Sequence, residues 1–273
     1  MRHHRARVES LEEVQPGAFL LGLWAEDICR GARPGQFYML RSGPEADPYL
    51  PRAFSWLRSL KAQGASREEA CSGLQILFQV VGKATGRLSR LHVGDEVEVV
   101  GPLGNGWHWG ESRAPLLVGG GIGAASLVCL LESFPPEVRG RTRAVVGAKD
   151  ANGLWCGREM SKLGASVSMA VERGAGGFPG TVVDLLRHRG MDLVSDETEV
   201  FACGPWGMLR EVARWAKHNQ LACQVSLEAP MACGVGVCLG CAVKLSSSGG
   251  YARVCLDGPV FRAEEIHWGE EDG

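Results

Sequence analysis

The sequence predicts a small antiparallel β-barrel, then an α/β doubly wound domain, then a short cysteine-rich C-terminal segment. Residues 1–108 contain short apolar runs separated by glycine and proline turns, which is typical of a barrel. Residues 109–222 alternate strand-like and helix-like patterns, which indicates a doubly wound sheet. Residues 223–273 are too few for a normal core but contain four closely spaced cysteines, so we expect a metal-stapled appendage.

The expected barrel strands lie at residues 18–24, 36–40, 74–81 and 96–100, and the polar residues 59–73 look like an inserted loop. In the α/β part, strands are expected at residues 116–118, 143–148, 167–171 and 200–204. Helices are expected at residues 124–133 and 207–218.

Composition excludes several classes of protein. The net charge of -2 gives no basic excess for nucleic acid. No window of about 18 apolar residues predicts a membrane span, and no apolar stretch follows the basic N-terminus. We therefore expect a cytoplasmic protein that binds neither nucleic acid nor membrane.

The C-terminal cysteines have the spacing C-x4-C-x2-C, followed after thirteen residues by a fourth. This is the spacing of a plant-type [2Fe–2S] loop. The alternative is a structural zinc site, but zinc sites usually repeat C-x2-C pairs and one pair is present here. The predicted ligands are Cys233, Cys238, Cys241 and Cys255. The remaining cysteines, apart from Cys203, are expected to be small buried side chains: Cys29, Cys71, Cys129, Cys156 and Cys223.

A possible flavin motif, Arg52-Ala53-Phe54-Ser55, comes at the end of an expected barrel strand. The arginine can pair with a diphosphate, the phenylalanine can stack on a ring, and the serine can reach a polar edge. Residues 82–88 form a turn into a short helix, where an anion could bind. A plain turn with a surface arginine is the alternative.

A possible nicotinamide motif follows the strand at residues 116–118. Gly119 and Gly121 fit G-x-G-x-x-A between a strand and a helix. No clear acidic residue follows about 20 residues later, so Lys149 and Asp150 are the candidates near a ribose, and the choice between NADH and NADPH stays open. Cys203, at the end of another strand, could contact the nicotinamide or could be a buried thiol before a turn.

Taken in order, these parts resemble the ferredoxin–NADP reductase superfamily. The matching motifs are residues 52–55, Gly119 to Gly123, and Cys203-Gly204-Pro205. Residues 226–241 and 254–261 closely resemble the electron-transfer subunit of class 1B dihydroorotate dehydrogenase, and residues 101–107 resemble its domain junction.

The resemblance implies an oxidoreductase subunit with FAD, a [2Fe–2S] cluster and NAD(H) as substrate. It places FAD in the barrel against residues 52–55, the backbone of Leu77, Phe78 and Gln79, and residues Ala84 and Thr85. It also implies an FMN-containing catalytic partner subunit that oxidises dihydroorotate in pyrimidine biosynthesis, in a heterotetramer. Electrons would pass from that FMN through the cluster and FAD to NAD+, and no catalytic acid, base or nucleophile is expected in this chain.

Two departures from the family pattern concern the cofactor sites. Ala84 replaces a usual glycine beside Thr85, and Ala125-Ser126 replaces a usual proline after the glycine turn. Alternative functions are a reductase subunit serving a hydrogenase, transhydrogenase or oxygenase, or a non-enzymatic zinc-stapled interaction module.

Overall fold

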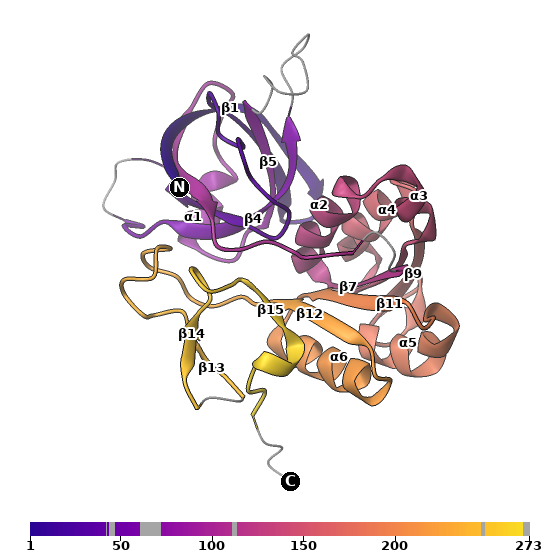
Figure 1. The fold of residues 1–273 in the computed structure, drawn as a ribbon. Coiled ribbons are helices and arrows are strands. Elements are labelled where there is room, and N and C mark those ends of the chain that lie inside the picture. The colour runs from indigo at the N-terminus through magenta and orange to yellow at the C-terminus, as the bar shows by residue number, and fades with distance from the viewer. Residues whose placement is uncertain (42, 44–46, 61–71, 111–113, 247–248, 270–273) are drawn as a thin grey trace.

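The computed structural model describes residues 1–41, 43, 47–60, 72–110, 114–246 and 249–269 (Figure 1). Its N-terminal part is a closed six-stranded barrel with strand order β1-β2-β5-β4-β3-β6. Its elements are β1 (Arg2–Gln15), β2 (Ala18–Trp24), β3 (Phe37–Arg41), β4 (Arg52–Leu60), β5 (Gly73–Gln79), α1 (Lys83–Leu88) and β6 (Glu96–Leu103).

The barrel confirms the four expected strands and adds two, β1 and β4, to which no strand range was assigned from the sequence. β1 pairs with β2 on one side and with β6 on the other, so it closes the barrel. In its first half only Ala6 and Val8 are buried, and charged residues alternate with them. This weak apolar signal explains why the strand was overlooked.

Two further barrel predictions need correction or qualification. The residue 52–55 motif begins strand β4 and does not end a strand as expected. Most of the expected inserted loop at residues 59–73 lies outside the described residues, while Ser59 and Leu60 belong to β4 and Gly73 begins β5.

The second part is a seven-stranded sheet of order β10-β9-β8-β7-β11-β12-β15. Neighbouring strands from β10 to β12 are parallel, and β15 joins antiparallel to β12. The strands are β7 (Ala114–Gly120), β8 (Arg143–Ala148), β9 (Ser166–Val171), β10 (Phe178–Pro179), β11 (Thr198–Cys203), β12 (Ala222–Ser226) and β15 (Val260–Arg262).

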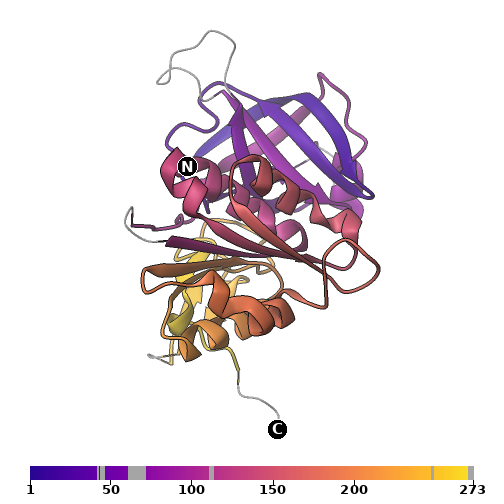
Figure 2. The same cartoon turned by 90° about the vertical axis from the view of Figure 1, so that its right-hand side faces the viewer.

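Helices cover both faces of this sheet, as a doubly wound fold requires (Figure 2). One core contains α2 and α4, and the other contains α5 and α6. The helices are α2 (Ala125–Ser133), α3 (Pro136–Arg141), α4 (Trp155–Lys162), α5 (Val182–Arg189) and α6 (Trp206–His218). The strand order reverses direction at the β7–β11 pair, which is where ligands bind in such sheets.

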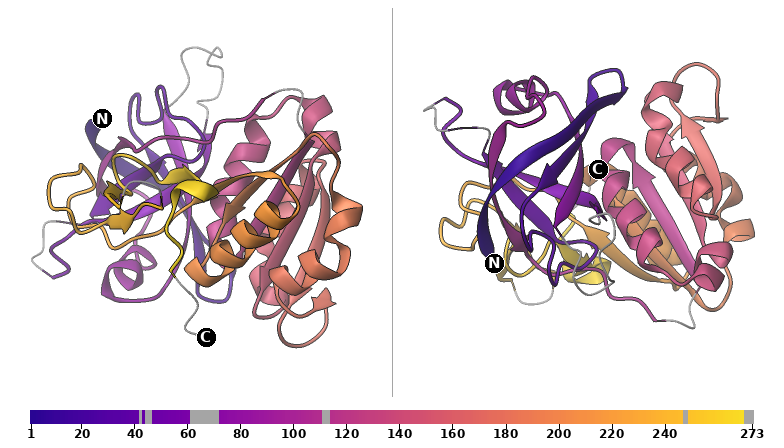
Figure 3. Two further views of the ribbon diagram at one scale, coloured as in Figure 1. Left: turned by 60° about the horizontal axis from the view of Figure 1, so that its bottom comes forward. Right: turned by 90° about the horizontal axis from the view of Figure 1, so that it is seen from above.

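The C-terminal segment lies against both other parts (Figure 3). It contains the short hairpin β13 (Ala242–Lys244) and β14 (Tyr251–Arg253). Asn105, in the expected junction, receives a hydrogen bond from the Val260 backbone N–H at 3.0 Å and donates to the carbonyls of Asp257 and Val260. β12 crosses the predicted boundary between residues 222 and 223, and β15 from the C-terminal segment joins the same sheet. The division into residues 1–108, 109–222 and 223–273 therefore stays a prediction.

No helix among the described residues is long and apolar enough to span a membrane. The cysteines outside the C-terminal cluster are mostly small buried side chains. Cys129, Cys156 and Cys223 are buried free thiols, and burial raises the pKa of each. Cys29 is buried and disulfide-bonded, whereas Cys71 lies outside the described residues.

Candidate functional site

The four predicted ligands lie on two neighbouring pieces of backbone. Cys233, Cys238 and Cys241 lie on the loop between β12 and β13, which we call the cysteine loop (residues 233–241). Cys255 follows β14. The hairpin brings the two pieces together, because the Val254 N–H donates to the Cys241 carbonyl at 3.1 Å.

Backbone N–H groups point at the sulfur atoms, as they do around thiolates. Val235 N lies 3.4 Å from Cys233 Sγ, and Gly236 N lies 3.1 Å from Cys255 Sγ. Hydrogen bonds from the backbone of Cys238 and Val235 lower the pKa of the Cys233 thiol to about 6. Since the thiolate is the metal-binding form, these bonds favour metal ligation by Cys233, whereas burial raises the pKa of the Cys255 thiol to about 12.

The sharp bend of the cysteine loop depends on glycine. Gly236 has φ +80°, and a Cβ there would lie 2.9 Å from Leu256 Cδ2. Any side chain at this position would combine backbone strain with a clash. The loop can therefore turn its N–H groups toward the sulfurs only with glycine at residue 236.

A [2Fe–2S] cluster takes four cysteine thiolates, shared between its two irons. The cysteine loop supplies three cysteines and Cys255 the fourth. The residues present therefore fit the cluster in number and type.

A cavity of about 420 Å³, which we call the barrel cavity, lies where the barrel meets the sheet. All nine residues predicted to contact FAD line it. They are Arg52, Ala53, Phe54, Ser55, Leu77, Phe78, Gln79, Ala84 and Thr85. The structure thus brings together two strand segments and the start of α1, which are separated by up to 33 residues in sequence.

The barrel cavity has aromatic and cationic groups suited to a flavin dinucleotide. Phe54 packs edge-on against Phe78 with ring centroids 6.0 Å apart. Arg52 donates to the Leu50 carbonyl at 2.8 Å and lines the wall. Thr85 Oγ1 accepts from the backbone N–H groups of Val81 at 2.9 Å and Gly82 at 3.1 Å, so it shapes the turn.

A second cavity of about 890 Å³, the sheet cavity, lies at the carboxyl ends of β7, β8, β9 and β11. Gly121, Gly123 and Gly204 line it, as predicted for a nicotinamide site. Cys203 instead lines the barrel cavity, and burial, with Glu228 nearby, raises the pKa of its thiol to about 12. Gly119 pairs with Cys203 inside the sheet and lines neither cavity.

The candidate ribose residues also lie on the sheet cavity. Lys149 and Asp150 both line it, after the end of β8. The Asp150 carboxylate accepts from the Asn152 N–H at 2.9 Å and thereby caps the following helical turn.

The two departures from the family pattern, at Ala84 and at Ala125-Ser126, lie beside the cavities and the domain junction. Ser126 is buried and its hydroxyl accepts from the Trp107 indole N–H at 3.1 Å, which a proline at that position could not do. Ala125 and Ala84 line the barrel cavity. Ser126 therefore ties the junction residue Trp107 to α2.

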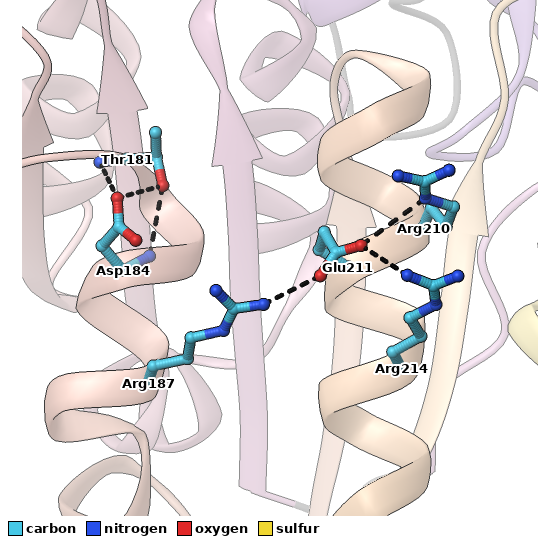
Figure 4. A network of polar contacts seen from close by, with 6 residues as sticks. All are labelled: Thr181, Asp184, Arg187, Arg210, Glu211 and Arg214. Carbon is cyan, nitrogen blue, oxygen red and sulfur yellow. Dashed lines mark hydrogen bonds and ion pairs between the residues drawn. The ribbon is translucent and has the colours of Figure 1, made fainter. Parts of the chain in front are cut away.

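The helix expected at residues 207–218 is α6, but its place on the sheet cavity, which it lines together with α5, was not predicted. Figure 4 shows the polar contacts of these two helices. The Glu211 carboxylate forms ion pairs with three arginines: Arg187 at 2.9 Å, Arg214 at 2.9 Å and Arg210 at 3.5 Å. Thr181 and Asp184 form a capping box at the start of α5, and hydrogen bonds from Thr181 lower the pKa of the Asp184 carboxyl. The T-x-x-D spacing before an apolar run could have revealed this helix start.

The end of β12 and the residues that follow it were also missed as cavity residues. Ser226, Leu227, Glu228, Ala229 and Met231 line the barrel cavity, and Met231 lies two residues before Cys233. This stretch belongs to the block that carried the family resemblance, but its position between cavity and cysteines required the fold.

The family model for the iron–sulfur cluster binding domain of dihydroorotate dehydrogenase B matches residues 228–267, which include all four predicted ligands. A relative from Desulforamulus reducens, named dihydroorotate dehydrogenase B (NAD(+)), electron transfer subunit, is 36% identical over 96% of this chain and 97% of its own. The same name is carried by a Geobacillus kaustophilus protein, 35% identical over 96% of this chain and 97% of its own.

Solved structures share the fold. An NADH-dependent reduced ferredoxin-NADP oxidoreductase structure matches with a TM-score of 0.81 and 26% identity, covering 96% of this chain and 90% of that chain. A ferredoxin NADP+ reductase from Neisseria gonorrhoeae, solved with bound FAD and NADP, matches with a TM-score of 0.61. It is 15% identical over 80% of this chain and 92% of its own, so this likeness concerns the fold. On the near-full-length relatives, the chain belongs to the family of dihydroorotate dehydrogenase B electron transfer subunits.

Proposed function

We propose that this chain passes electrons between a partner subunit that oxidises dihydroorotate and NAD+, as the names of its relatives state for them. The chain is an oxidoreductase subunit that binds FAD, a [2Fe–2S] cluster and NAD(H). When bound, FAD exchanges two electrons with the nicotinamide and single electrons with the cluster, which joins two-electron chemistry to one-electron transfer. The residues of this chain bind and orient these groups.

Each cofactor has a proposed set of protein contacts. Cys233, Cys238, Cys241 and Cys255 hold the cluster. The barrel cavity, with residues 52–55, 77–79, 84 and 85, holds FAD, and Cys203 lies on its wall. Gly121, Gly123 and Gly204 form the floor of the nicotinamide site, with Gly119 supporting it from within β7.

The observation that carries this proposal is the order of the three sites. Gln79, Ile122, Gly123 and Glu228 line both cavities, so the barrel cavity adjoins the sheet cavity. Met231 lines the barrel cavity as well, and only one residue separates it from Cys233 in the sequence. FAD in the barrel cavity would therefore lie between the nicotinamide and the cluster.

The catalytic partner subunit is proposed to carry FMN and to dock over the cysteine loop in a two-plus-two heterotetramer. Cys238 is exposed, and exposed apolar side chains surround it in the chain, of which Val237 is 79% and Leu239 62% accessible. Tyr251 on the adjoining hairpin and Leu256 just after it are also exposed. An apolar surface around a ligand suits a protein interface that must bring two redox centres close together.

The test combines composition with activity. Purified chain should contain flavin and about two irons per chain, reduce an artificial acceptor with NADH, and leave dihydroorotate unchanged until the FMN subunit is added. Oxidation of dihydroorotate by the chain alone would refute the division of labour. A colourless, flavin-free protein with one zinc would support the interaction-module alternative.

A second candidate is a flavin and iron–sulfur reductase subunit that serves another redox partner. The 26% identical NADH-dependent reduced ferredoxin-NADP oxidoreductase, which covers nearly the whole chain, favours it. Co-purification from the native cell separates the two candidates. An FMN-containing dihydroorotate dehydrogenase subunit supports the first, and a hydrogenase, transhydrogenase or oxygenase supports the second.

A further inference from the structure

The junction of the two cavities contains one ionisable side chain. Of the four residues that line both cavities, Gln79, Ile122 and Gly123 carry no charge, whereas Glu228 has a carboxylate. In the proposed function the flavin and nicotinamide rings meet at this junction, because hydride transfer requires reacting atoms roughly 3–3.5 Å apart. Glu228 is therefore placed to contact the reacting rings.

The backbone around Glu228 is held by the sheet. Ser226 pairs with Cys203 at the end of β11, and the Leu227 N–H donates to the Pro259 carbonyl at 2.9 Å. Leu227 is buried, while Glu228 itself is accessible from the cavities. These contacts hold the backbone that carries Glu228 at the cavity junction.

Within the described part of the chain, the Glu228 carboxylate has no hydrogen bond or ion pair. The cations on the barrel cavity wall are engaged elsewhere: Lys83 pairs with Asp47 at 2.7 Å, and Arg52 donates to the Leu50 carbonyl. Surrounding protein withdraws water from Glu228, and this burial raises the pKa of its carboxyl. Lys149, Arg187 and Arg210 line the sheet cavity, but none of them forms an ion pair with Glu228 among the described residues. An ionised, partly desolvated carboxylate at the junction therefore gains from a cationic ligand.

We propose that Glu228 distinguishes oxidised from reduced nicotinamide, because NAD+ carries a positive charge on its ring and NADH does not. The inference rests on the proposed function, since it assumes a nicotinamide ring at the cavity junction. The carboxylate attracts the cationic ring and offers the neutral ring no comparable interaction. It thereby favours capture of NAD+ and release of NADH, the direction that the proposed function needs.

The test measures binding to the FAD-loaded protein in its oxidised state. The probes are NAD+ and 1,4,5,6-tetrahydro-NAD, whose neutral ring cannot donate a hydride. Glu228→Gln keeps the shape and removes the charge. We expect its NAD+ affinity to fall about tenfold while tetrahydro-NAD affinity changes less than about threefold, from one lost charge–charge attraction at a partly solvated site. Calorimetric titration gives both dissociation constants.

Matched variants separate charge from shape and position. Glu228→Asp retains the charge and should retain most of the preference for NAD+. Glu172→Gln removes a carboxylate that lines the sheet cavity away from the junction, and should alter both affinities by the same factor. The FAD absorbance of each variant reports whether its barrel cavity is intact.

Equal losses for both ligands in Glu228→Gln, or no loss for either, would overturn the inference and leave the proposed function standing. Failure of the unmodified protein to bind either ligand would instead contradict the nicotinamide site of the proposed function. The inference would also be overturned if the ratio of NAD+ affinity to tetrahydro-NAD affinity stayed normal in Glu228→Gln but changed in Glu172→Gln. Glu172 would then be the carboxylate that distinguishes the two ligands.

Discussion

The cysteine loop and the sheet cavity both adjoin the barrel cavity, but different contacts hold them together. The sheet cavity rests on buried parallel strands, with Leu116, Val118, Val145 and Val200 fully buried beneath it. The cysteine loop has little regular structure, and Val237 and Leu239 on it face outward. We therefore expect the sheet cavity to form without its ligand and the cysteine loop to depend on the cluster that its thiolates are predicted to bind.

The largest expected effect comes from removing a buried ligand. Cys241→Ser should abolish the iron–sulfur absorbance and electron transfer to the partner, because a serine hydroxyl is a poor substitute for a thiolate. Reduction of an artificial acceptor by NADH should persist, since the two cavities do not include Cys241. Iron analysis and acceptor assays measure the two outcomes.

Cys223→Ala is the matched control, because Cys223 is a buried free thiol outside the cysteine loop. It should keep its full iron content. Loss of NADH-dependent acceptor reduction in Cys241→Ser, with FAD still bound, would show that the two regions are not independent.

A smaller effect is expected from closing the sheet cavity. A Cβ at Gly204 would lie 2.7 Å from Met208 Cε and 3.1 Å from Gly120 Cα. Gly204→Val should therefore push the two turns apart at a cost of about 1–3 kcal/mol. If this strain lowers the binding free energy of NAD+ by the same amount, the NAD+ affinity falls roughly tenfold to 100-fold.

Titration of NAD+ into Gly204→Val measures this loss, with iron and FAD content as controls. Both contents should stay at the level of the unmodified protein. Unchanged NAD+ affinity would mean that the sheet cavity is not the nicotinamide site.

The exposed face of the cysteine loop should matter to the partner and little to the fold. Val237→Asp places a charge on an apolar surface without disturbing a buried contact, so the melting temperature should stay nearly constant. Binding to the FMN subunit should weaken roughly tenfold if Val237 lies in the interface. Affinity measurement against the purified partner tests this, and unchanged affinity would place the interface elsewhere.

The smallest expected effect concerns the arginines around Glu211 (Figure 4). Glu211→Gln removes the carboxylate that Arg187 and Arg210 share, and both arginines line the sheet cavity. Their freed charge should raise affinity for the 2′-phosphate of NADP+ about threefold, the scale of a partly exposed ion pair.

Competitive titration of NAD+ and NADP+ measures the change in preference. Arg214→Gln serves as a control, because Arg214 also contacts Glu211 but does not line the cavity. A fall in NADP+ affinity in Glu211→Gln would contradict the charge argument.

The fold and the family are predictable from the sequence where chemistry prescribes residue type and spacing. Four cysteines and the glycines between them predict a cluster loop, because thiolate ligation and tight turns tolerate few substitutes. Residues 52–55, 84 and 85 line one cavity, and their contact with FAD stays a prediction. β1 was missed because its charged, half-exposed residues give little periodic signal. Cys203 is buried and lines the barrel cavity, so its contact with the nicotinamide also stays a prediction.

The sequence by itself determined the order of the parts and the family and predicts the ligand set, since these follow from motifs that are local in the chain. The tertiary structure decided which distant segments of the chain lie side by side. The junction at Gln79, Ile122, Gly123 and Glu228 joins β5, the turn after β7 and the end of β12. No local pattern encodes that meeting, because it arises only when the barrel closes and packs against the carboxyl edge of the sheet.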